Sequence, residues 1–170
     1  EEQQMLVEMT RSFVEKEMLP HEETLENTDA LPPELAASLR KRSMELGLHA
    51  CNLPEKVGGG GLDAVSVMLI EKELGRTSLA LAECAHRPLN ILAACKDEQV
   101  TQFLEPTLRG EKRDCIAMTE PGAGSDLRGM KCKAVRDGGC WIINGEKHFI
   151  SQAFVSDFCV LFAATGEETT

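Results

Sequence analysis

Residues 118–129 form the segment whose residue types could do chemistry. The segment reads MTEPGAGSDLRG and holds three glycines, two hydroxyls and two carboxylates. Gly122 and Gly124 match the start of the G-x-G-x-x-G loop that binds dinucleotides, but Leu127 occupies the place of the third glycine. The segment therefore poses the question of which ligand, if any, it receives.

A dinucleotide loop needs a strand before it and a helix after it. The residues that follow, MKCKAVRDGGCWIIN, read as strand, turn and strand, and no lysine follows the glycines as a P-loop requires. Two interpretations remain open from the spacing: a plain glycine-rich β-turn, and a turn whose exposed N–H groups receive an anion. In either case Thr119 and Ser125 supply hydroxyls, and Glu120 and Asp126 are expected to fix the turn.

The elements around this segment are expected to be strands. Short apolar or alternating runs occur in CIAMT, MKCKAV, CWIIN, KHFIS and FCVLFAA, and DGG is a turn signal between the second and third. Cys115 and Cys132 are expected in the core of these strands, and Trp141 is expected to be packed in the hairpin.

The residues before position 110 are expected to be helical. Met5, Met9 and Phe13 recur every four residues, and Pro20 is expected to end that helix. Further helices are expected from Pro32 and Pro33 to the cap Gly47, from the cap Asp63 to Leu74, across the buried residues 78–95, where Pro88 kinks or divides the helix, and from Asp97 to Gly110. Helices before strands predict an α+β chain. It consists of an all-α helical domain over 1–112 and part of an antiparallel β-barrel or sheet domain over 113–170.

Charge and cysteine usage exclude several classes of function. The formal net charge of −10 argues against nucleic-acid binding and against binding to an anionic membrane surface. Seven cysteines without a C-x-x-C pair, and four scattered histidines, predict neither a metal site nor a disulfide framework. No apolar run is long enough to span a membrane. Reduced cysteines indicate a bacterial cytoplasm, or the mitochondrial matrix if a presequence was removed.

Two ordered motifs carry a family resemblance. AMTEPGAGSDLRG followed by WIINGEKHFIS resembles the T-E-P-x-A-G-S-D and I-N-G-x-K motifs of the acyl-CoA dehydrogenases. LPEKVGGGGLD and EKELGR resemble that family's helical domain, so the likeness runs from about Met5 to Thr165. It implies a helical domain, a middle β domain, and a C-terminal helical domain that is expected to be absent from this chain.

The resemblance implies FAD as cofactor and α,β-dehydrogenation of an acyl-CoA thioester to the enoyl-CoA. Thr119 would bond the pyrimidine edge of the flavin, Ser151 would reach flavin N5, and Ser125 would also contact the acyl-CoA. Phe149 stands where the family usually has tryptophan, and Gln152 departs from the usual asparagine or glycine. The implied FAD-binding residues are Ile116, Ala117, Met118, Thr119, Gly124, Ser125, Phe149, Ile150 and Ser151.

No catalytic residue is assigned, because the family's glutamate base comes from the C-terminal domain. These residues alone are therefore expected to be inactive. The implied partners are an acyl-CoA substrate, an electron-transfer flavoprotein, and further copies in a homotetramer or homodimer. The alternatives are a non-catalytic partner subunit of the same fold, or a related acyl-CoA oxidase or nitroalkane-oxidase-type flavoenzyme. Near the implied acyl pocket, Glu83, His86 and Arg87 either face solvent, pair with one another, or receive a polar acyl group.

Overall fold

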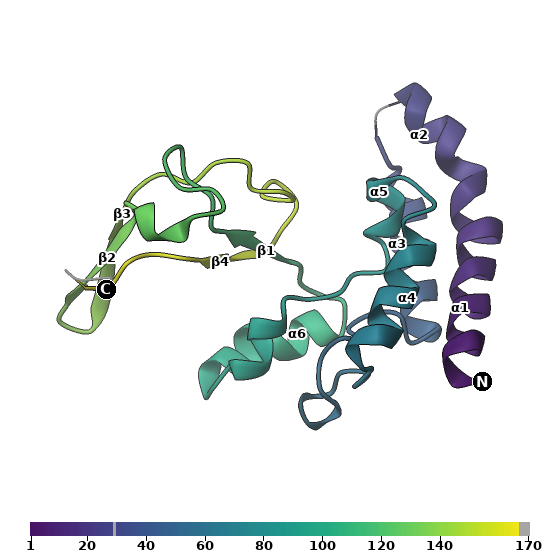
Figure 1. The fold of residues 1–170 in the computed structure, drawn as a ribbon, viewed down its shortest axis with the longest axis horizontal. Coiled ribbons are helices and arrows are strands. Elements are labelled where there is room, and N and C mark those ends of the chain that lie inside the picture. The colour runs from purple at the N-terminus through teal and green to yellow at the C-terminus, as the bar shows by residue number, and fades with distance from the viewer. Residues whose placement is uncertain (29, 167–170) are drawn as a thin grey trace. The chain divides into compact units, whose positions relative to one another are not determined.

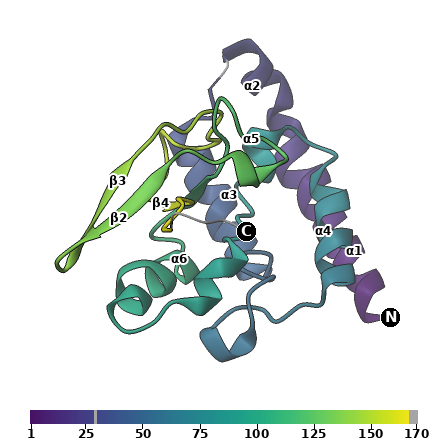
Figure 2. The same cartoon turned by 60° about the vertical axis from the view of Figure 1, so that its left-hand side comes forward.

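A computed structural model of the chain describes residues 1–28 and 30–166. The chain divides into two compact units, Glu1–Glu111 and Lys112–Thr170. The first unit holds helices, and every named strand lies in the second (Figures 1 and 2). The predicted α+β order, helices before strands, is confirmed.

Among the described residues of the first unit, six α-helices are joined by shorter helical turns. The α-helices are α1 (Glu2–Phe13), α2 (Glu22–Thr28), α3 (Pro33–Glu45), α4 (Ala64–Leu74), α5 (Leu79–Ala82) and α6 (Glu105–Leu108). The shorter turns are Val14–Met18 and Val100–Leu104, which are π-helical, and Leu19–His21, Glu55–Val57 and Asn90–Ala94, which are 3-10 helical. Within the described part of the chain, no helix has the length and apolar character needed to cross a membrane.

The core of the first unit lies where α1 runs beside α4 (Figures 1 and 2). Phe13, Met18 and Ile70 are among its buried side chains. Each such burial contributes about 1.5–3 kcal/mol. Arg11 on α1 donates two hydrogen bonds, of 3.0 and 2.8 Å, to the buried carboxylate of Glu73 on α4. Apolar packing and this ion pair together fix the two helices side by side.

Several predicted helix boundaries are confirmed. Asp63 caps α4, since its side chain accepts hydrogen bonds of 2.8 and 3.0 Å from the backbone N–H groups of Val65 and Ser66. Pro33 is the first residue of α3. Gly47 and Gly110 both take positive φ angles, as residues just beyond a helix end often do.

Pro20 does not end the first helical segment, so that prediction is wrong. After α1 the chain continues through a π-helical turn and a 3-10 turn directly into α2. Pro20 follows Leu19, the first residue of the 3-10 turn. At this position a residue does not need its N–H for an intrahelical bond. The widened π-turn before it therefore lets the helical path pass the proline.

The predicted buried helix over 78–95 is divided, which the prediction allowed at Pro88, but its helical parts are shorter than expected. Only α5 forms, and the chain then leaves the helix for turns before Asn90–Ala94. Pro88, which is fully buried, cannot donate a helical hydrogen bond. Asp97 does not cap the last helix either: its φ of 47° places it in a left-handed turn.

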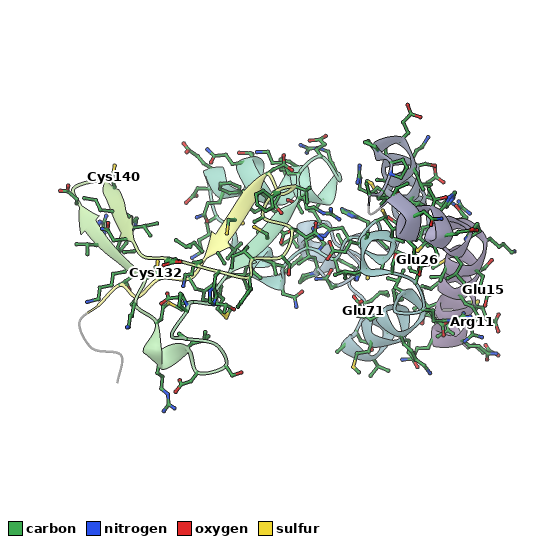
Figure 3. The ribbon with its side chains drawn as sticks, turned by 90° about the horizontal axis from the view of Figure 1, so that it is seen from above. Arg11, Glu15, Glu26, Glu71, Cys132 and Cys140 are labelled. Atoms are coloured by element: carbon green, nitrogen blue, oxygen red, sulfur yellow. The ribbon has the colours of Figure 1, made fainter. Side chains whose placement is uncertain are left out.

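The second unit contains two separate strand pairs. Strands β2 (Lys133–Asp137) and β3 (Cys140–Asn144) form the predicted antiparallel hairpin, with Gly138 at φ 58° in its turn. Figure 3 labels Cys140 at the turn end of this hairpin and Cys132 near its other end. Strands β1 (Asp114–Ala117) and β4 (Phe158–Leu161) pair in parallel rather than antiparallel. The long connection between them allows this, because it brings the chain back to the start of β1.

Two further predictions about the second unit are wrong. KHFIS is not a strand, because Phe149 within it takes a left-handed conformation, with a φ of 57°, that a strand does not contain. Trp141 is not packed but 52% exposed, since all of β3 is exposed and its only strand partner among the described residues is β2. Cys115 and Cys132 are buried, as predicted.

Candidate functional site

The segment that begins at Met118 folds as a tight turn directly after β1. Glu120 and Ala123 exchange two backbone hydrogen bonds of 3.0 and 3.1 Å, which place Pro121 and Gly122 at the tip. A Cβ atom added at Gly122 or Gly124 would meet nothing within 4 Å. The glycines therefore leave open space beside the backbone, which is what close approach by a flat ligand needs.

Glu120 fixes the base of this turn, as predicted. Its side chain is buried, and it accepts hydrogen bonds from the backbone N–H groups of Lys131 (2.6 Å) and Cys132 (3.0 Å). The ammonium of Lys147 donates a third bond of 2.7 Å. Lys147 first, and then the backbone N–H donors, lower the pKa of Glu120 to about 2. Glu120 is thus ionised near neutral pH, and its hydrogen bonds hold the turn in place.

Asp126 has the same role on a smaller scale. Its carboxylate accepts a bond of 3.0 Å from the backbone N–H of Arg128 and two further bonds from the guanidinium of that residue. The prediction that Asp126 fixes the turn is confirmed.

The second motif lies directly against the first. Lys147 donates a hydrogen bond of 3.0 Å to the carbonyl of Met118, and the backbone N–H of His148 donates one of 3.0 Å to the carbonyl of Thr119. Gly145 makes this approach possible, because a Cβ atom there would lie 2.5 Å from the Cα of Cys132. The two motifs, nearly thirty residues apart in sequence, therefore form one continuous surface.

The residues predicted to bind the cofactor fall along this surface. Ile116 and Ala117 belong to β1, and Met118 and Thr119 continue directly from it. Gly124 and Ser125 are exposed just beyond the turn. These six positions lie on one continuous stretch of backbone, from Ile116 to Ser125.

The predicted residues of the second motif leave that stretch through His148. Phe149 is 85% exposed, and its ring lies 4.1 Å from the imidazole of His148, centroid to centroid. Ile150 is half-buried and Ser151 is exposed. The bond from His148 to Thr119 thus brings the Phe149 segment beside the first motif, whereas no described side-chain bond joins Ser125 to Ser151.

Lys147 is the functional residue that the sequence did not reveal. Its place in the I-N-G-x-K motif was a signal, but spacing alone did not show which carboxylate it would meet. The structure shows that its partner is Glu120, 27 positions earlier.

The arrangement can hold a planar, polar ring. It offers an exposed aromatic side chain, open space at two glycines, and hydroxyls at Thr119, Ser125 and Ser151. These features fit the isoalloxazine ring of a flavin. Glu120 does not serve as a general base on this surface, because a carboxylate with a pKa of about 2 is too weak to remove a proton near neutral pH. Among the described residues, no group of three His, Cys, Asp or Glu side chains could hold a metal ion.

In the helical unit, Arg87 pairs with Glu71 on α4, which Figure 3 labels. The Nη2 atom of Arg87 donates to one oxygen of Glu71 at 2.9 Å, and Nε donates to the other. The rings of His86 and His49 lie 6.0 Å apart. In this structure the guanidinium of Arg87 is therefore paired with the carboxylate of Glu71.

The relatives of this chain include an acyl-CoA dehydrogenase and a subunit of a reductase complex. Mitochondrial short-chain specific acyl-CoA dehydrogenase of Bos taurus is 35% identical over 170 residues, which cover 97% of this chain and 40% of that protein. A subunit of the caffeyl-CoA reductase–Etf complex of Acetobacterium woodii is 31% identical over 171 residues, covering 97% of this chain and 44% of that one. This chain thus spans less than half the length of these relatives.

Solved structures show the same likeness. A glutaryl-CoA dehydrogenase of Mycobacterium smegmatis in complex with FADH2 superimposes with a TM-score of 0.79 at 28% identity, covering 97% of this chain and 43% of that one. Residues 1–111 match the family model of the acyl-CoA dehydrogenase N-terminal domain, and residues 115–170 match that of the middle domain. The chain therefore belongs to the acyl-CoA dehydrogenase family.

Proposed function

We propose that the protein is an FAD-dependent oxidoreductase that dehydrogenates an acyl-CoA thioester between its α and β carbons. The observation that carries this proposal is the joined surface of the two motifs, with open space at Gly122 and Gly124 beside an exposed Phe149. Family membership supports the flavin as the ring that this surface receives. When bound, FAD supplies the acceptor for the hydride that leaves the β carbon.

The residues of this chain would bind and orient the reactants. In this proposal Thr119 bonds the pyrimidine edge of the flavin, and Phe149 covers part of the ring face. Ser125 contacts both the flavin and the acyl-CoA, and Ser151 places its hydroxyl near flavin N5. The backbone from Ile116 to Gly124 forms the wall behind the ring.

The catalytic base is assigned to none of the 170 residues. Glu120, the carboxylate in the first motif, is excluded because Lys147 and two backbone N–H groups hold it ionised and occupied. We therefore expect the 170-residue chain alone to form no enoyl-CoA when mixed with FAD, an acyl-CoA and an electron acceptor. Product formation in that mixture would show that a base lies within this chain.

The wider organisation is part of the proposal. We propose domains over 1–112 and 113–170, which the two compact units and the two family matches support. The relative in an Etf complex supports an electron-transfer flavoprotein as the electron acceptor. A homotetramer or homodimer is expected from the family resemblance. All seven cysteines are free thiols, which supports a reducing compartment such as a bacterial cytoplasm or the mitochondrial matrix.

The test is FAD binding by the protein as its gene encodes it, followed through quenching of flavin fluorescence. Phe149→Leu removes the aromatic face, and Phe154→Leu is the matched control because Phe154 is exposed in the same segment but outside the proposed site. Loss of one aromatic stacking contact weakens binding about tenfold. We expect this weakening of FAD binding for Phe149→Leu and not for Phe154→Leu. Wild-type protein that binds no FAD, or equal effects of the two variants, would contradict the proposal.

A further inference from the structure

One buried ion pair crosses between the two motifs of the second unit. The side chains of Lys147 and Glu120 are only 8% and 5% exposed. By contrast, the ion pair of Arg128 with Asp126 in the same unit is 88% and 63% exposed and joins residues two positions apart. Lys147 and Glu120 thus form a pair that is both buried and long-range.

Besides bonding each other, the two side chains bond backbone groups of two further segments. One oxygen of Glu120 accepts from Lys131 N, and the other accepts from Cys132 N and from Lys147 Nζ. Lys147 Nζ donates in turn to the carbonyl of Met118. The pair therefore ties the end of β1, the approach to β2, and the segment after β3 to one point.

A buried ion pair with this geometry specifies an arrangement more than it stabilises the fold. The cost of removing two charges from water offsets much of their attraction. What remains is a directional constraint, since the ammonium must lie where both the carboxylate and the Met118 carbonyl accept its protons. The next residue, His148, then meets Thr119, and Phe149 follows on the exposed surface.

We propose that Lys147 and Glu120 are the positioning pair of the flavin site, setting the separation between the Thr119 backbone and the Phe149 ring. This inference rests on the proposed function, because it concerns the same surface. Neither residue touches the flavin: Lys147 acts through Met118 and His148, and Glu120 acts through the turn that it closes.

The test separates positioning from simple loss of stability. Lys147→Met keeps the length of the side chain and removes the ammonium. Ala134→Gly is the matched control, because Ala134 is buried in β2 of the same unit and contacts the backbone ladder rather than the pair. We expect both variants to lower the melting temperature of the unit. The affinity for FAD and the visible absorption spectrum of the bound flavin at saturation are then measured for each variant.

We expect Lys147→Met to weaken FAD binding at least about tenfold and to alter the spectrum of the bound flavin, while Ala134→Gly leaves both within about twofold of wild type. Glu120→Gln, which keeps the side-chain shape, is the second variant if Lys147→Met does not fold. It is expected to change the flavin spectrum in the same direction.

Each outcome decides between the two claims. Lys147→Met and Ala134→Gly with equal FAD affinity and unchanged spectra would overturn the positioning role and leave the proposed function intact. Wild-type protein that binds no FAD would overturn the proposed function, and the inference that rests on it would fall for that separate reason.

Discussion

Replacing Gly145 by alanine tests the close approach on which the joined surface depends. Gly145 follows β3 and precedes Lys147, and its φ of 155° is a conformation that side chains rarely adopt. An alanine Cβ at this position would lie 2.5 Å from the Cα, 2.6 Å from the Cβ and 2.8 Å from the Sγ of Cys132. The nearest atom is the backbone Cα, and the Cβ is bonded directly to it, so neither can rotate away.

The magnitude follows from these distances. Carbon atoms in contact prefer a separation of about 3.5–4.0 Å, so one of the two segments must shift by about 1 Å or more. Overpacking of this kind costs about 1–3 kcal/mol, and a strained φ adds about 1–3 kcal/mol. A total of about 2–6 kcal/mol lowers the melting temperature of a unit of this size by about 10 °C or more.

The assay is thermal unfolding followed by tryptophan emission. Trp141 is the single tryptophan and lies in β3, so its signal reports on the second unit. Gly139→Ala is the matched control, because a Cβ there meets nothing within 4 Å and its φ is not left-handed. We expect the control to melt within about 2 °C of wild type. Gly145→Ala melting as high as the control would refute the close approach.

Three further predictions concern the core, pH and oxidation. Phe13→Ala, at a fully buried position in the helical unit, is expected to cost about 3–5 kcal/mol in the unfolding free energy measured with urea by far-UV circular dichroism. Because Lys147 holds the pKa of Glu120 at about 2, below its ordinary value of 4.5, the stability from this carboxylate is present above pH 4.5 and lost as pH falls towards 2. Acid titration of Trp141 emission checks this, and Glu120→Gln should remove that part of the transition. Cys115 and Cys159 are register partners on the parallel strands β1 and β4, at a spacing of about 5 Å that permits a disulfide. Hydrogen peroxide is expected to oxidise the two thiols to a disulfide and two waters. Because burial and then the neighbouring Cys115 raise the pKa of Cys159 to about 11, the reaction should accelerate from pH 8 to 10. If the intact mass of the protein stays unchanged after peroxide treatment at pH 10, the predicted disulfide between Cys115 and Cys159 is refuted.

Local patterns predicted the boundaries that local physics controls. Asp63 caps α4 because a carboxylate before a helix meets free N–H groups whatever the rest of the chain does. The same holds for Pro33 at a helix start and for Gly138 in the hairpin turn. Predictions failed where neighbours decided the path. A π-turn let the helix pass Pro20, and the chain left the expected buried helix after Ala82, well before Pro88.

The KHFIS segment shows why a run of residue types is not enough. Its alternation resembles a strand, yet a hydrogen bond from His148 to Thr119 and the left-handed Phe149 hold it as an irregular segment. Whether a segment pairs as a strand depends on which distant segment lies beside it in the fold, and the sequence does not show which segment that is.

The sequence by itself determined the order of helices and strands, the turn at Glu120, and the family, because these depend on residue types at short spacings. Only the tertiary structure decided that Lys147 meets Glu120, that Gly145 passes against Cys132, and that β1 and β4 pair in parallel. Those contacts join residues far apart in the chain. Their geometry is set by how the whole unit packs, and no local pattern encodes it.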